Sequence, residues 1–282
     1  MKKTGVMLTF VLGVLLVIPG FLPGALADSY IQNLGDGAVN WTKGVIQGKG
    51  IGAPPEKFYG KPNARPMAIR AAKIVALRNI LETVNGIRVD SNTVVKDFAV
   101  QSDTIRSQVE GMVRGAREIN VEYLSDGTVE VVMEISMYGD FSRVLLPQAI
   151  LAFPMETPGA APGSAAPSSA VLTGLVVDAR GLGVRPAMAP KILDESGQEV
   201  YGSAFVSREF AVQQGMSGYA KELDSARKNQ RVTANPLVVK GLRVEGPGQC
   251  DIVISNTDAV RLRNSSADLS FLEKCRVMIV VD

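Results

Sequence analysis

The sequence predicts an α+β protein of two small domains, each a mixed sheet with helices packed on one face, joined by a Pro/Ala-rich linker. Hydrophobic residues recur with helical spacing in some segments and with strand spacing in others. Residues 153–169 are rich in proline, glycine, alanine and serine, which predicts an extended linker. The 282 residues, less an export signal, suit two domains of ~150 residues each. The expected domains are residues 30–152 and 170–282.

Residues 1–27 are expected to be a signal peptide. Lys2 and Lys3 precede a long apolar run, and residues 25–27 read Ala-Leu-Ala, the small-residue pattern of a cleavage site. We therefore predict cleavage between Ala27 and Asp28, a periplasmic location and no membrane span after cleavage. An uncleaved anchor is the alternative, because residues 4–27 carry no charge and are long enough to cross a bilayer.

The composition argues against catalysis and against nucleic-acid binding. Without residues 1–27 the chain keeps 28 basic and 28 acidic side chains, so its bulk charge attracts neither nucleic acid nor anionic lipid. The absence of histidine excludes Ser-His, Cys-His and His-metal sites. Two cysteines are too few for a thiolate metal site. We expect no enzyme activity and no cofactor.

In the first domain the pattern predicts a strand at residues 39–47 and a long helix at 65–84. The helix has apolar residues three and four positions apart, and Gly86 follows it as a stop signal. A shorter helix is expected from residue 102 or 103 to 112, after a natural N-cap. Residues 119–137 alternate around Ser-Asp-Gly, which predicts a hairpin.

In the second domain we expect a strand at 171–177, a hairpin of residues 191–193 and 199–201, a helix at 207–214 and a strand at 237–244. The last two strands, 251–255 and 276–281, are joined by a crossover with room for a helix, which predicts a β-α-β unit. Parallel neighbouring strands start at one end of a sheet, ~4.8 Å apart. Cys250 and Cys275 each immediately precede one of these strands, so the pattern predicts a disulfide between them.

The run of residues 48–53, Gly-Lys-Gly-Ile-Gly-Ala, resembles a dinucleotide-binding fingerprint after a strand. That fingerprint works only where a helix begins inside the glycine run, and here two prolines follow. We interpret the glycines as a bulge or turn that needs backbone freedom.

Three other features have a functional and a structural interpretation. Asp178, Arg180 and Arg185 lie in a glycine-rich loop that could bind an anion or a peptide carboxylate, or could be organised by an internal salt bridge. Residues 194–195 are two adjacent acids in a hairpin turn, where acids are common for conformational reasons. Trp41, on a predicted strand, is expected in the core rather than at a ligand.

Several positions of the first domain resemble a bacterial envelope family. They are Asn40-Trp41, the glycines at 48, 50 and 52, the alanine-rich helix with residues 69–72 and 76–82, the segment 84–91, residues 113–116 and the hairpin ending at Gly139. Together they resemble the small membrane-associated lipoprotein (lipoprotein-20) family and the N-terminal domain of flagellar assembly protein T, over residues 35–146. The chain lacks the lipoprotein cysteine and has one further domain where a three-domain ring protein has two.

The resemblance implies a periplasmic, non-enzymatic module that works by protein contacts. The function expected from the sequence is a scaffold or assembly factor of the cell envelope, with flagellar association as one form of it. The alternative is a periplasmic binding module that presents a peptide or small-anion site in the loop 178–185. The expected partners are envelope or flagellar proteins, or further copies of the chain.

Overall fold

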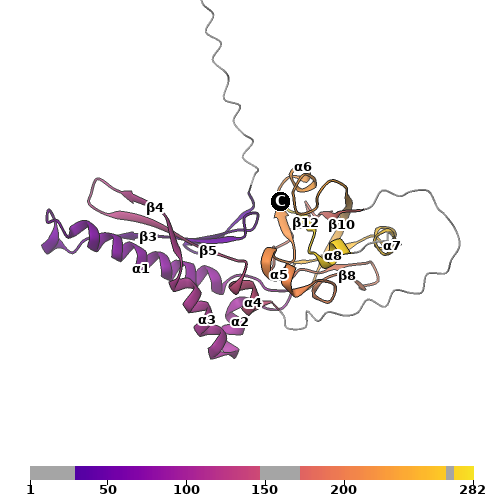
Figure 1. Cartoon of the computed structure of the whole chain (residues 1–282), viewed down its shortest axis with the longest axis horizontal. Coiled ribbons are helices and arrows are strands. Elements are labelled where there is room, and N and C mark those ends of the chain that lie inside the picture. Colours follow the sequence, from indigo (N-terminus) through magenta and orange to yellow (C-terminus); the bar gives the residue numbers. More distant parts are fainter. Residues whose placement is uncertain (1–28, 147–171, 265–269) are drawn as a thin grey trace, which may run out of the picture.

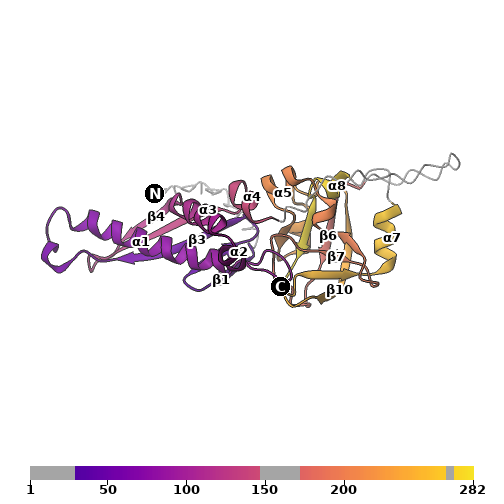
Figure 2. The ribbon, with the colours of Figure 1, turned by 90° about the horizontal axis from the view of Figure 1, so that it is seen from below.

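The computed structural model describes residues 29–146, 172–264 and 270–282 of the chain. They form two units that lie one after the other along the long axis of the molecule (Figures 1 and 2). The predicted α+β class with two domains is confirmed. The predicted signal peptide, its cleavage site at Ala27 and Asp28, and the linker 153–169 lie outside the described residues.

The first unit is an antiparallel sheet in the order β1-β2-β3-β5-β4 with helices on one face. Its elements are β1 (Ile31–Leu34), β2 (Gly37–Asn40), β3 (Val45–Gly52), a short 3-10 helix (Glu56–Phe58), α1 (Ala64–Asn85), α2 (Val95–Gln101), α3 (Asp103–Arg114), β4 (Arg117–Tyr123), β5 (Val129–Ser136) and α4 (Asp140–Leu145). The long helix, the shorter helix and the hairpin match the predictions. The expected strand 39–47 is divided into β2 and β3 by a turn at residues 41–44.

Helix α1 lies unusually close to β3, and the glycines of the predicted motif explain why. Gly48, Gly50 and Gly52 are buried on the face of β3 that α1 covers. A Cβ atom on Gly50 would fall inside contact distance of the Ala72 carbonyl oxygen and the Ala76 nitrogen. The interpretation of this motif as a bulge or turn is therefore wrong: the three glycines lie within a regular strand and admit the backbone of a helix.

The alanines of α1 complete this contact. Ala68, Ala72 and Ala76 are fully buried and recur every fourth residue, on one face of the helix. Gly52 lies against Ala68 and Ala72, and Gly48 lies against Ala76. Because both surfaces lack bulky side chains, dispersion contacts are made between the two backbones themselves.

The second unit is a seven-stranded mixed sheet in the order β8-β7-β11-β10-β6-β12-β9. Its elements are β6 (Gly174–Asp178), β7 (Ile192–Leu193), β8 (Glu199–Tyr201), a short 3-10 helix (Ser203–Phe205), α5 (Arg208–Gln214), β9 (Gly218–Ala220), α6 (Leu223–Arg227), β10 (Pro236–Glu245), β11 (Asp251–Ile254), α7 (Asn256–Asn264), α8 (Ser270–Glu273) and β12 (Val277–Val280). The sequence analysis did not predict β9 or α6.

Helices cover both faces of this second sheet, where the sequence led us to expect them on one. Leu175 and Val177 of β6 join the large core that includes α5, α7 and α8. Val176, between them, joins a smaller cluster on the opposite face with Ala226 of α6 and Met278 of β12. Alternating strand residues point to opposite faces, so the uninterrupted apolar runs of β6 and β12 fit a sheet buried on both sides.

The predicted terminal β-α-β unit and its disulfide are wrong. Strands β10 and β6 lie between β11 and β12, and β11 is antiparallel to β10, whereas β6 and β12 run parallel to β10. The strands that follow Cys250 and Cys275 therefore begin at opposite ends of the sheet and are separated by three strand spacings, ~14 Å at ~4.8 Å each. That separation exceeds disulfide reach, and both cysteines are free and buried.

The two units meet at an extensive contact and share one hydrophobic core. The main chain of Met188 donates to the Arg88 carbonyl at 3.0 Å, and that of Ala189 donates to the Val89 carbonyl at 2.7 Å. The rings of Trp41 and Tyr219 meet edge to face, with their centroids 5.4 Å apart. The largest core cluster runs without interruption from β2 to β12. The predicted core position of Trp41 is confirmed, at the junction of the units.

Among the described residues, no helix combines the length and the apolar character that crossing a membrane requires.

Candidate contact surfaces

The loop after β6 is organised by an internal salt bridge. The Arg180 guanidinium contacts both carboxylate oxygens of Asp178, with Nε–Oδ1 at 2.8 Å and Nη2–Oδ2 at 2.7 Å. The bond from Arg180 is the main cause that lowers the pKa of Asp178. Arg185 is tied to another loop through its main chain, which donates to the Gln249 carbonyl at 2.8 Å. Since Arg180 is engaged by an adjacent acid, the structural interpretation fits this loop better than the anion site.

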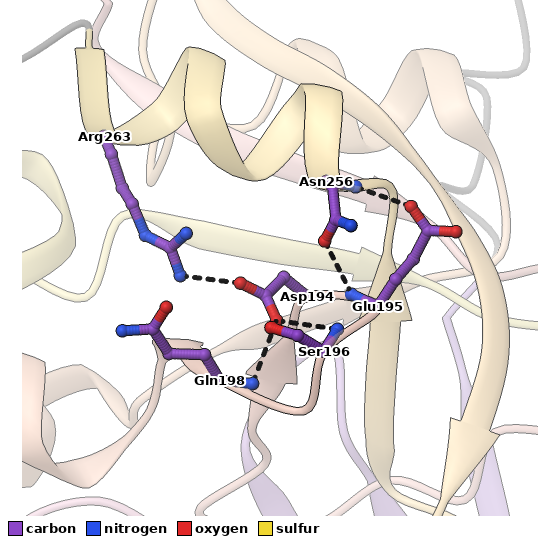
Figure 3. A network of polar contacts seen from close by, with 6 residues as sticks. All are labelled: Asp194, Glu195, Ser196, Gln198, Asn256 and Arg263. Atoms are coloured by element: carbon purple, nitrogen blue, oxygen red, sulfur yellow. Dashed lines mark hydrogen bonds and ion pairs between the residues drawn. The ribbon is translucent and has the colours of Figure 1, made fainter.

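Asp194 anchors the β7–β8 turn to helix α7 (Figure 3). Its buried carboxylate accepts hydrogen bonds from the Ser196 hydroxyl at 2.5 Å, the Gln198 main chain at 2.9 Å and Arg263 Nη2 at 2.9 Å. The Ser196 bond, opposed by desolvation and reinforced by Arg263, lowers the pKa of Asp194 to about 2. This carboxylate is therefore ionised at neutral pH and has a structural role.

Glu195 makes a reciprocal pair with the first residue of α7. Its main chain donates to Asn256 Oδ1 at 3.1 Å, and its Oε2 accepts from the Asn256 main chain at 2.9 Å (Figure 3). Such an arrangement satisfies an N-terminal amide of the helix, which has no partner within it. Both adjacent acids thus hold a turn, as the sequence analysis expected.

The face of the first sheet opposite α1 has a row of paired charges. Lys49 contacts Glu130 at 2.6 Å across β3 and β5, and Arg117 contacts Glu134 at 2.5 Å across β4 and β5. Glu134 also accepts from Gln47 Nε2 at 2.8 Å. Burial favours the protonated form of Glu134, but the bonds from Gln47 and Arg117 outweigh it and lower its pKa. Most of these charges neutralise one another, so this face is polar without a strong field.

Strand β4 is an edge of the first sheet and pairs only with β5 among the described strands. Six of its seven residues are exposed. Ile119 and Tyr123 are 41% and 56% exposed, and Leu124 directly after the strand is 44% exposed. The register shifts between Glu118 and Asn120, which places a bulge at Ile119. Edges of this kind can receive a strand from another chain, and bulges and charges limit which strand fits.

At the junction of the two units, a partly open cavity of about 20 Å³ lies beside Trp41, Tyr138 and Ser217. That volume holds roughly one water molecule. The junction is consequently closely packed around Trp41. Within residues 29–146, 172–264 and 270–282, no group of three Cys, Asp or Glu side chains is arranged to hold a metal ion.

Sequence reasoning missed the contact between the two units. Its residues come from turns and strand ends that are far apart in the sequence, such as Thr42, whose hydroxyl donates to the Tyr219 carbonyl at 2.9 Å. The clearest signal was Trp41, a large aromatic that the sequence analysis expected in the core. The edge character of β4 also depends on strand order, which local patterns do not contain.

Comparison with known families places one match on the second unit. Residues 174–282 match the family described as Treponema pallidum Tp0624, second domain. The match begins at the first residue of β6 and covers well under half of the chain. The whole second unit is therefore similar to a domain found in another protein. No curated protein matches the chain.

Proposed function

We propose that the protein is a non-enzymatic scaffold or assembly factor of the cell envelope, exported to the periplasm and acting through its surfaces. The observation that carries this proposal is the exposed edge strand β4, with Ile119, Tyr123 and Leu124 as apolar anchors. A partner strand would pair with the main chain of β4, and these side chains would supply specificity. The charged residues of β4 would disfavour indiscriminate pairing.

The junction between the units supports a scaffold role. A shared core and main-chain hydrogen bonds across the contact hold the units in one orientation. In both views α1, β3 and the β4–β5 hairpin extend away from the second unit (Figures 1 and 2). A partner bound at β4 would therefore be held at a fixed position relative to the second unit.

The resemblance of the first domain to lipoprotein-20 proteins and to flagellar assembly protein T makes the flagellum the first envelope structure to test. Clean deletion of the gene should impair motility or envelope integrity. Normal motility with a defective envelope would exclude the flagellar form of the proposal and retain the scaffold. Mature protein from the periplasm should begin at Asp28, and an N-terminus at Met1 would contradict export by cleavage.

Site-specific photo-crosslinking tests the contact surface. A photoreactive residue in place of Ile119 or Tyr123 should capture one defined partner in intact cells. Val260, which is 48% exposed on α7 of the other unit, is a matched control position. The same adducts from Val260, or none from either β4 position, would contradict β4 as the contact surface.

A further inference from the structure

A groove in the second unit is bordered by three segments that are distant in the sequence. The end of α5 supplies Gln213 and Gln214, the turn after α6 supplies Gln230 and Arg231, and the segment before β12 supplies Lys274 and Arg276. One part of the groove has a volume of about 410 Å³. A second part, of about 380 Å³, shares Gln214, Gln230 and Arg231 and continues towards Thr42 of the first unit.

The charge of the groove is strongly positive. Three cationic side chains and several amides line it, and no carboxylate of the residues that the structure describes lines either part. Among the described residues, none of the three cations has an acidic side chain within ion-pair distance, whereas Arg180, Arg243 and Arg261 all have one. The carboxylate bound to a lining residue is that of Glu209, which accepts from Gln213 Nε2 at 3.2 Å.

Arg231 is held in place by neutral groups. Its Nη1 donates to the carbonyls of Gly215 at 3.0 Å and Cys275 at 2.9 Å, and its Nη2 donates to the Gln214 carbonyl. These bonds fix the guanidinium without neutralising its charge by a carboxylate. Gln214 Nε2 in turn donates to the Lys274 carbonyl at 2.6 Å, which ties two borders of the groove together. The guanidinium of Arg231 and two backbone borders of the groove are thus held in place.

We infer that this groove binds a small, multiply charged oxyanion, such as a solute with linked phosphates or several carboxylates. Lys274 and Arg276 would contact the anion, Arg231 would provide a fixed positive field behind it, and the amides of Gln213 and Gln230 would donate further hydrogen bonds. Charged donors on an anion form the stronger class of hydrogen bond. The volume of either part suits a small molecule. This site is distinct from the loop 178–185 and from the β4 edge.

Calorimetric titration of the purified chain with pyrophosphate and with citrate, at constant ionic strength, tests the inference. We expect saturable binding of at least one of them, and a loss of affinity of about tenfold or more, or ~1.4 kcal/mol, in the double variant Lys274→Gln/Arg276→Gln. The control Lys228→Gln/Lys240→Gln removes the same charge at exposed positions of this unit outside the groove. Its affinity should stay within about twofold of the wild type.

Equal losses of affinity in the two double variants would show a bulk-charge effect and overturn the inference. The absence of binding of both anions would also overturn it. Should Lys274→Gln/Arg276→Gln unfold, NMR of the wild-type chain decides. The side-chain amide signals of Gln213 and Gln230 should then shift with pyrophosphate, and shifts confined to other regions would overturn the inference. Binding to anionic vesicles without binding to pyrophosphate or citrate would likewise contradict a solute site.

Discussion

Gly50 occupies a position where one added methyl group would meet the backbone of another element. A Cβ there lies against the Ala72 carbonyl oxygen and the Ala76 nitrogen, which belong to a helix and cannot rotate away. We predict that Gly50→Ala lowers the free energy of unfolding by about 1–3 kcal/mol through overpacking. Gly111, in α3, is the matched control, because its Cβ would meet nothing within 4 Å.

Gly111→Ala should stabilise the protein by up to ~1 kcal/mol, since alanine is the better helix former. Urea unfolding of both variants measures the two effects. Equal or stabilising effects of both substitutions would contradict the close approach of α1 and β3.

The ionised carboxylate of Asp194 makes stability depend on pH. Its pKa is about 2 in the folded chain against an ordinary value of 3.8, so its contribution to stability is complete above about pH 4. That contribution is lost as the pH falls through the folded pKa. The free energy of unfolding should therefore fall more steeply between about pH 4 and pH 2 in the wild type than in Asp194→Asn.

Arg263→Gln should weaken the same pH dependence, because Arg263 contacts the Asp194 carboxylate. Arg261→Gln, on the same helix, removes a pair with Asp258 and is the control. Identical pH profiles for the wild type and Asp194→Asn would show that the network does not hold this carboxylate ionised.

The cysteines provide a chemical test of the strand order. Burial raises the pKa of the Cys250 thiol to about 12 and that of Cys275 to about 11, so neither is a thiolate near pH 8. We predict slow reaction with a thiol reagent in the native protein and two free thiols in denaturant without reductant. A closed disulfide would require β11 and β12 to be neighbours and would contradict the sheet described above.

Turns and helix caps that depend on residues close together in the sequence could be predicted from the sequence alone. The β4–β5 hairpin followed from Ser-Asp-Gly, where Gly127 has a φ of +85° and Asp126 accepts from the Thr128 main chain at 2.9 Å. The N-cap of α3 was equally local: Ser102 Oγ accepts from the Ile105 main chain at 3.3 Å. Each signal involves residues within a few positions of one another.

Elements that depend on distant partners could not be predicted in this way. Strand β9 has three residues and exists because it pairs with β12, far along the chain. The separation of β11 from β12 results from β6 and β10 entering between them, and a crossover length does not reveal such an insertion. The same limit applies to function: the lining residues Gln213, Gln230 and Lys274 become neighbours only through the fold.

At the scale of the whole molecule, the shared core predicts cooperative unfolding. Trp41, the only tryptophan, contacts Tyr219 of the other unit and donates to Gln32 Oε1 at 2.9 Å. We predict a single calorimetric transition in which Trp41 fluorescence and far-ultraviolet circular dichroism coincide.

Trp41→Ala should cost about 3–5 kcal/mol and split this transition, because it removes a large ring from the junction. Tyr123→Ala, at an exposed aromatic far along the first unit, should change stability by less than about 0.5 kcal/mol. Two separate transitions in the wild-type protein would show that the units unfold independently.

The glycines of β3 (Gly48–Gly52) and the alanines of α1 (Ala68–Ala76) that face one another repeat at nearly equal distances along the two elements. Two strand residues advance ~6.8 Å, whereas four helix residues advance ~6.0 Å. The mismatch of ~0.8 Å per step therefore reaches about half a step after roughly four steps. In a longer contact of this kind the glycines would no longer lie opposite the alanines, so the difference in spacing limits the length of the contact. A larger residue at one of the β3 glycines should be tolerated only when the facing alanine of α1 is replaced by glycine. This predicts paired second-site suppressors between β3 and α1.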